Sequence, residues 1–161
     1  MRPKGDDLSR FVGALQAMLL RLALMMVADG EGASKIMRVQ VAGTETASDA
    51  AAVARAIGNS PLVKTAMHGG DPNWGRIISS AGAAMAGRTL PRASLQLCGV
   101  NVFDEGTAQP VSDADRAAIA EAMMEPEIDI GLDLGLGFHS AQLFFADMGH
   151  EYISINAEYH S

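Results

Sequence analysis

The segment Glu127-Ile128-Asp129-Ile130-Gly131-Leu132-Asp133-Leu134 alternates apolar side chains with acidic residues and a glycine. A period of two places every second side chain on one face, so the segment predicts a strand with one buried face. Residues 139–147 predict another strand, and Gly135-Leu136-Gly137 between the two favours a hairpin. Antiparallel neighbours among interspersed helices and strands favour an α/β (α+β) fold with a mixed or antiparallel sheet layered with helices, rather than a doubly wound sheet.

The elements upstream alternate between helix and strand. Apolar residues recur at three- and four-residue steps from Leu8 to Met26, which indicates an amphipathic helix that Asp7 can cap and Gly30 can end. We interpret its methionine-rich stripe as part of the core. The further predicted elements are a strand at 35–41, a helix at 48–57, an extended or helical piece at 62–67, a helix at 73–85, a strand at 95–102 with a turn near Gly99, and a helix at 113–124 capped by Ser112.

The composition indicates one soluble domain spanning residues 1–161. Hydrophobic residues make up 48% of the chain and the net charge is -7. Nucleic acid is therefore not an expected partner, because phosphate binding needs clustered Lys and Arg. The single cysteine, Cys98, excludes an internal disulfide, and we interpret it as a small buried hydrophobe in a reducing compartment. The histidines lack the spacing of metal ligands, so no metal site is expected.

The most apolar stretch runs from Phe11 to Ala28. Gln16 and Arg21 interrupt it, and on that ground we interpret it as too short and too polar to span a bilayer. The residues before it include acidic side chains and no apolar region of a signal peptide. The sequence therefore predicts a cytoplasmic protein with no membrane partner.

Two glycine-rich segments are candidates for ligand binding. In Asp29-Gly30-Glu31-Gly32-Ala33-Ser34-Lys35, a carboxylate in a turn where the backbone can approach a ligand could fix an amine; the alternative is a helix-ending turn with solvated acids. In the segment from Val63 to Arg76, which includes Gly69-Gly70-Asp71-Pro72-Asn73-Trp74, a helix start could bind an anion. The alternative there is a structural cap by Asp71, with Trp74 buried and Arg76 paired with Asp71.

These segments and the chain end together resemble a known family. The motifs are the 29–35 segment, Ser-Pro-Leu-Val-Lys-Thr-Ala at 60–66, Asp-Pro-Asn-Trp-Gly-Arg-Ile at 71–77 and Tyr-Ile-Ser-Ile-Asn-Ala-Glu-Tyr at 152–159. In order and approximate spacing they resemble the bifunctional ornithine acetyltransferase/glutamate N-acetyltransferase family of arginine biosynthesis. The resemblance covers roughly Leu8 to Ser161, the C-terminal or β-chain part of such a protein.

The resemblance implies an activity and an assembly. Members of the family cleave their own precursor before a threonine, which then heads the β chain as the nucleophile of a ping-pong reaction. This threonine takes acetyl from N-acetylornithine and passes it to glutamate. The resemblance implies no cofactor, leaves acetyl-CoA open as an acetyl donor, and implies an α chain as partner in a heterotetramer of two α and two β chains.

The resemblance also implies which parts of the machinery this chain carries. Glu31, Asn156 and Ser161 match the family's substrate-binding positions, whereas Lys64, Asp71, Asn73 and Arg76 match motif positions that we interpret as shaping the fold. Every threonine lies after Glu31, and the family nucleophile lies well before it, so no catalytic residue is expected in this chain. Residues 1–7 match nothing expected and are predicted to be a disordered or non-native start.

The expectations leave three functions open. The first is part of an acyltransferase that is inactive alone. The second is a module that binds an amino acid without chemistry. The third is a remnant that only assembles with partners.

Overall fold

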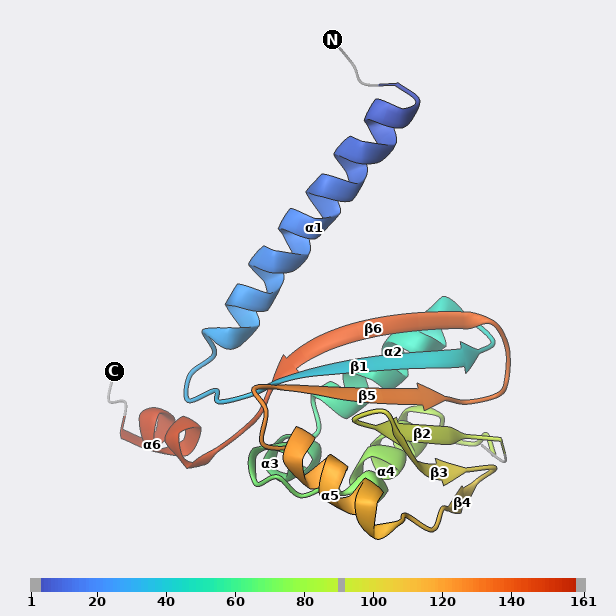
Figure 1. Ribbon diagram of the computed structural model, residues 1–161, viewed down its shortest axis with the longest axis vertical. Helices are drawn as coiled ribbons and strands as arrows, with labels where there is room; N and C mark the ends of the chain where they lie inside the picture. Colours follow the sequence, from blue (N-terminus) through green and yellow to red (C-terminus); the bar gives the residue numbers. More distant parts are fainter. Residues whose placement is uncertain (1–3, 90–91, 159–161) are drawn as a thin grey trace.

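A single mixed sheet organises the computed structural model, which describes residues 4–89 and 92–158 as six helices and six strands (Figure 1). The strands are β1 (Ile36–Thr44), β2 (Ser94–Leu97), β3 (Val100–Asp104), β4 (Thr107–Ala108), β5 (Glu127–Asp133) and β6 (His139–Ala146). Their order across the sheet is β4-β3-β2-β5-β1-β6. Since β1 is parallel to β5 and the other pairings are antiparallel, the mixed sheet expected from the sequence is confirmed.

The predicted hairpin of β5 and β6 is wrong, because β1 lies between these strands. The connection from β5 to β6 passes over the end of β1, where the Leu136 N–H donates to the Gly43 carbonyl at 2.7 Å. Gly137 packs there directly against the backbone of Thr44, which leaves no room for a Cβ. A connection of this length can therefore cross one strand, which the spacing of the two apolar patterns alone does not reveal.

Four helices cover one face of the sheet: α2 (Ala47–Gly58), α3 (Pro61–His68), α4 (Trp74–Ala84) and α5 (Asp113–Ala122). Each begins at a side chain that accepts a hydrogen bond from a backbone N–H of the first turn, which confirms the predicted cap at Ser112. The segment 62–67, left as extended or helical, is helical in α3. The largest fully buried side chains between these layers are Met37, Ile57, Met67, Ile77, Leu95, Leu97, Met123, Ile128, Ile130, Leu132 and Leu134.

The segment 95–102 forms two strands rather than one. β2 and β3 are joined by Cys98 and Gly99, whose φ angles of 52° and 80° are both positive. Such a pair matches the right-handed twist of adjacent strands and closes a two-residue hairpin. Cys98 is accordingly half-buried at the turn, against the edge of the core, and not enclosed within a strand. Partial burial raises the pKa of its thiol.

Two helices project away from the sheet: α1 (Asp6–Ala28) and α6 (His150–Glu158) (Figure 1). Every residue of α1 is at least partly exposed, and the exposed fractions of Met18 and Met26 reach 62% and 79%. The interpretation of the methionine-rich stripe as core is therefore wrong. The pattern indicates an apolar face, but within the described residues the rest of the chain does not cover it. The helix begins at Asp6, so Asp7 lies in its first turn instead of capping it.

The length of α1 also overturns an expectation. Its 23 residues are long and apolar enough to cross a membrane by length and composition, so the sequence argument that the stretch is too short and too polar was wrong. The core helix of a soluble protein and a signal sequence near the N-terminus pass the same two criteria. Length and composition therefore do not decide what surrounds this helix.

The first prediction concerns the core of the sheet. Ile130 in β5 is 1% exposed and faces α2–α5, whereas Gln40 in the adjacent β1 is exposed on the opposite face. Ile130→Ala should lower the free energy of unfolding by about 2–5 kcal/mol, because it leaves a cavity in a packed layer. Gln40→Ala should change it by less than about 0.5 kcal/mol. Denaturant titration of both variants measures the difference, and equal losses would contradict the one-sided core.

Candidate functional site

Two of the predicted binding residues meet in the structure, although they are 125 residues apart in the sequence. Glu31 lies in the loop between α1 and β1, and Asn156 lies on α6. The Asn156 side-chain amide donates to Glu31 Oε2 at 3.0 Å and to the Tyr152 carbonyl at 2.8 Å. Both residues are exposed to solvent or partly so, and a ligand can therefore reach them. The third predicted residue, Ser161, lies outside the described residues.

Gly32 makes this meeting possible. Its φ is +64°, in the left-handed region, and a Cβ on it would run into the backbone of Glu151 and Tyr152 at the start of α6. Only glycine combines that backbone conformation with the absence of a side chain. The glycine-rich segment is thus a loop packed directly on the helix that carries Asn156.

A buried carboxylate fixes the other end of the same loop. The side chain of Asp147 is fully buried; its Oδ1 accepts the backbone N–H groups of Ser34 at 2.8 Å and Lys35 at 2.9 Å. Its Oδ2 accepts the Ser34 hydroxyl at 2.6 Å and meets His68 Nδ1 at 2.7 Å. Burial alone raises the pKa of Asp147, but the hydrogen bonds from Ser34, His68 and Lys35 outweigh it and hold that pKa below its ordinary value. The carboxylate is thus ionised near neutral pH.

Lys35 connects the loop to the helical layer. Its ammonium group donates to the carbonyls of Met67 at 3.0 Å, His68 at 3.4 Å and Met123 at 2.7 Å. These carbonyls end α3 and α5, where a positive charge is favourable because the last carbonyls of a helix lack partners within it. Sequence reasoning missed Lys35, Asp147 and His68, because a side chain that serves several distant elements leaves no local pattern.

The second glycine-rich segment has a structural role. Asn73, not Asp71, caps α4: its side chain accepts from the Arg76 N–H at 3.2 Å and donates to Asp71 at 3.0 Å. Arg76 donates to the Leu62 carbonyl at 2.9 Å, so the predicted Arg76–Asp71 pair is wrong. Trp74 is half-buried and stacks on Phe103 with ring centroids 5.3 Å apart. The structural cap of that alternative is therefore present, but at Asn73 instead of Asp71.

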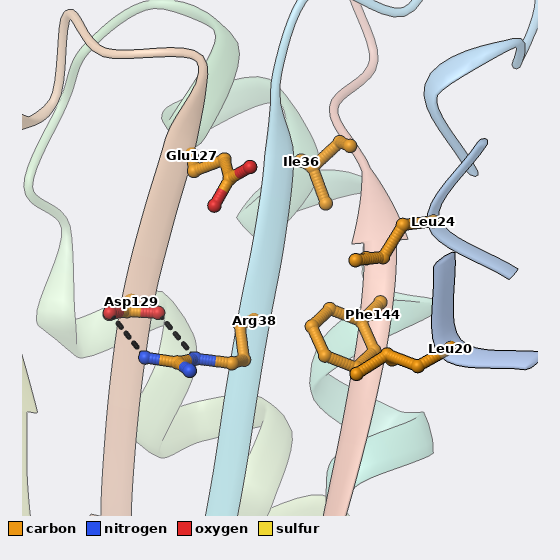
Figure 2. A pocket seen from close by; sticks show the side chains of 7 residues that line it. All are labelled: Leu20, Leu24, Ile36, Arg38, Glu127, Asp129 and Phe144. Carbon is orange, nitrogen blue, oxygen red and sulfur yellow. Dashed lines mark hydrogen bonds and ion pairs between the residues drawn. The ribbon is translucent and has the colours of Figure 1, made fainter. Parts of the chain in front are cut away.

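A separate hollow lies between α1 and the open face of the sheet (Figure 2). It has a volume of about 190 Å³, with Leu20, Leu24 and Phe144 on its apolar side. On its polar side Arg38 donates two hydrogen bonds of 2.6 Å to Asp129. Its lining does not include Glu31 or Asn156, so hollow and candidate site are different places. Across residues 4–89 and 92–158, no cluster of three metal-ligating side chains is present.

Comparison with known proteins identifies close relatives. A model of the ArgJ family matches residues 2–161. The chain is 40% identical over 98% of its length to the arginine biosynthesis bifunctional protein ArgJ of Nitratidesulfovibrio vulgaris, and 42% identical over 96% of its length to the protein of that name from Zymomonas mobilis. It spans 40% and 37% of the lengths of those relatives.

A solved structure supports the fold independently. The crystal structure of arginine biosynthesis bifunctional protein ArgJ from Bacillus halodurans superposes with a TM-score of 0.88 at 30% identity, over 99% of this chain and 74% of that chain. Because the match includes nearly every residue, the similarity extends to the two projecting helices as well as to the sheet. The fold class expected from the motifs is confirmed.

The second prediction concerns Asp147. Asp147→Ala removes the acceptor of two backbone N–H groups, a hydroxyl and an imidazole, and should lower the free energy of unfolding by about 3 kcal/mol or more. Asp147→Asn should cost less, because its amide oxygen still accepts the backbone N–H groups.

Lowering the pH should remove the stabilisation by Asp147 from the unsubstituted protein. Since the folded-state pKa of Asp147 is lowered, its stabilisation is complete above the ordinary pKa of an aspartate and is lost as the pH falls through the folded-state pKa. Denaturant titrations from about pH 7 to about pH 3 measure this loss. Asp147→Asn should flatten the acid limb; an unchanged limb would show that other carboxylates cause it.

Proposed function

The chain belongs to the ArgJ family, and from this we propose that it forms part of an enzyme that transfers an acetyl group from N-acetylornithine to glutamate in arginine biosynthesis. The observation that carries the proposal is the hydrogen bond between Glu31 and Asn156. Two motifs from opposite ends of the chain converge there on one exposed polar pair, which is suited to a small, charged substrate. Acetyl-CoA as a further acetyl donor belongs to the same proposal.

Glu31 is proposed to bind the amine of the substrate. A carboxylate offers about four lone-pair positions, and the Asn156 amide occupies one of them. An ammonium group forms the stronger, charge-assisted hydrogen bond, so a substrate amine can share Glu31 with Asn156 or displace it. Asn156 keeps its bond to the Tyr152 carbonyl in either case and stays beside the substrate. Ser161 is proposed to complete this pocket.

The nucleophile is proposed to come from outside these 161 residues. The hydroxyl oxygen of an upstream threonine attacks the acetyl carbon of N-acetylornithine, the amide C–N bond breaks, and the hydroxyl proton leaves with the ornithine amine. The amine of glutamate then attacks the acetyl-threonine ester, which releases the hydroxyl and forms N-acetylglutamate. Stabilisation of the developing oxyanion is also assigned to the upstream part. Glu31 and Asn156 contribute binding and orientation to this sequence.

The upstream part, generated by cleavage of a common precursor, is proposed to dock on α1. The chain spans about two fifths of its relatives, and a large apolar face that the described residues leave uncovered is typical of a protein–protein contact. The exposed apolar side chains of α1 are Leu8, Phe11, Val12, Leu15, Met18, Leu19, Leu20, Leu22, Met25 and Met26. Burying them against a protein partner accounts for the helix in a cytoplasmic protein, and two such pairs would form the expected heterotetramer.

The third prediction tests catalysis. The purified chain should show no acetyl transfer from N-acetylornithine to glutamate, and co-purification with the upstream part of a relative should produce it. In that complex Glu31→Gln should lower kcat/KM by about 10- to 100-fold, the equivalent of one charge-assisted hydrogen bond. Glu121→Gln, at an exposed position of α5, is the matched control.

Two results would count against this scheme. Turnover by the chain alone would refute an external nucleophile, and an unchanged kcat/KM in Glu31→Gln would remove Glu31 from the site. Binding of ornithine or glutamate to the chain alone, measured by calorimetry without turnover in any complex, would favour a binding module instead.

The fourth prediction tests the docking surface. Leu15→Gln combined with Met18→Gln places two amides on α1 where apolar contact is expected, and should weaken association with the upstream part by at least about tenfold. Gln16→Ala, on the same helix, should leave association unchanged or strengthen it slightly. Analytical gel filtration of mixed components measures both, and equal association of all variants would exclude α1 as the docking surface.

A further inference from the structure

We propose that His68 is a positioning residue of the candidate site: by holding Asp147, it joins the Glu31 loop to the start of α6 and keeps Glu31 opposite Asn156. The inference rests on the proposed function only in taking the Glu31–Asn156 pair as the place where a ligand binds. The family motifs quoted above do not assign a role to His68, and it does not contact the pair directly.

The first step is the hydrogen bond of the imidazole. His68 is the last residue of α3, and its Nδ1 lies 2.7 Å from Asp147 Oδ2 and 3.4 Å from the Ser34 hydroxyl. An ionised carboxylate only accepts hydrogen bonds, so the Nδ1 atom is the one that carries the proton and donates it. The side chain of His68 is 34% exposed while that of Asp147 is fully buried. The ring thus covers the carboxylate from the solvent side.

The second step concerns where the donors to Asp147 come from. Three of them belong to Ser34 and Lys35 in the loop itself, and the fourth comes from His68 in the helical layer. A buried carboxylate is strongly unfavourable unless hydrogen bonds satisfy it. The loop donors fix the carboxylate relative to the loop, whereas His68 fixes both relative to α3. Without His68, the carboxylate loses its own hydrogen bond to α3, while the Lys35 ammonium still ties the end of the loop to that helix.

The third step is the packing of the ring on α6. A Cβ on Gly149 would run into the His68 ring, so this glycine lies against it. The next residue, His150, begins α6, and its ring stands edge-on to that of His68 at a centroid distance of 6.2 Å. The His68 ring therefore packs against the start of α6. Gly32 packs on the following residues of the same helix from the loop side.

The positions of Glu31 and Asn156 consequently both depend on the His68 ring. One route runs from His68 through Asp147 and Ser34 to the loop that carries Glu31. The other runs from His68 through Gly149 into α6, where Asn156 is held by the Tyr152 carbonyl. Displacement of the ring should loosen both segments together, while strands on the far side of the core keep their protection.

Two substitutions separate the hydrogen bond from the volume of the ring. His68→Phe keeps a ring against Gly149 but removes the donor to Asp147. His68→Asn loses the ring, but its amide nitrogen can occupy the position of Nδ1 and donate. Because the ring itself packs on α6, the hydrogen bond is tested in the loop that carries Glu31: there the asparagine variant should behave like the unchanged protein and the phenylalanine variant should differ.

Hydrogen–deuterium exchange of the full chain, followed by mass spectrometry, tests this. In His68→Phe, peptides covering 29–36 and 148–157 should exchange about tenfold faster, while a peptide covering β5 stays as in the unchanged protein. His68→Asn should restore slow exchange in 29–36, whereas 148–157, which loses the ring against Gly149, should stay faster. Unchanged exchange of 29–36 in His68→Phe would overturn the proposal, and so would equally fast exchange of 29–36 in the two variants, because the ring and not its hydrogen bond would then hold the loop.

A measurement without substitution covers the case in which His68→Phe does not fold. In the unchanged chain, the ¹⁵N chemical shifts of the neutral His68 ring should show the proton on Nδ1. A proton on Nε2 instead would overturn the donor role. Neither measurement involves a substrate, so failure of acetyl transfer in the reconstituted complex would refute the proposed function and leave the role of His68 standing.

Discussion

The charged carboxylate of Asp147 is buried, and it accepts hydrogen bonds from two backbone N–H groups, a hydroxyl and an imidazole. Removing a carboxylate from water is costly, and each missing donor leaves part of that cost uncompensated. The donors come from the loop after α1 and from the end of α3, and the acceptor comes from the connection between β6 and α6. Three distant parts of the chain are thereby held at one point, and the candidate site is built beside it.

Lys35 complements this carboxylate with the opposite charge. Its backbone N–H belongs to the Asp147 group, while its ammonium caps the ends of α3 and α5. The residue before β1 is therefore tied to the connection that follows β6 and to the ends of α3 and α5. Glu31, four residues earlier, inherits a fixed position from these bonds, even though its own side chain is exposed.

The two faces of the sheet differ in a way that bears on assembly. One face is closed by α2–α5 around a continuous apolar core, and the other carries polar pairs such as Arg38 with Asp129 and is flanked by an uncovered apolar helix (Figure 2). The chain spans about two fifths of its relatives, and the proposed docking of an upstream part uses this helix. In the proposed function, this chain supplies the substrate-binding groups and the upstream part supplies the reacting hydroxyl.

The sequence by itself determined local structure and the identity of the motifs. Its periodicities identified the strands 127–134 and 35–41 and the helices near 48–57 and 113–124, because backbone hydrogen bonding and side-chain direction are set within a few residues. The four motifs sufficed to single out Glu31 and Asn156. The tertiary structure alone decided that β1 separates β5 from β6, that α1 is uncovered, and that His68 reaches Asp147. A periodic pattern states that one face is buried but not what buries it, and a bond between residues 79 positions apart has no local signature.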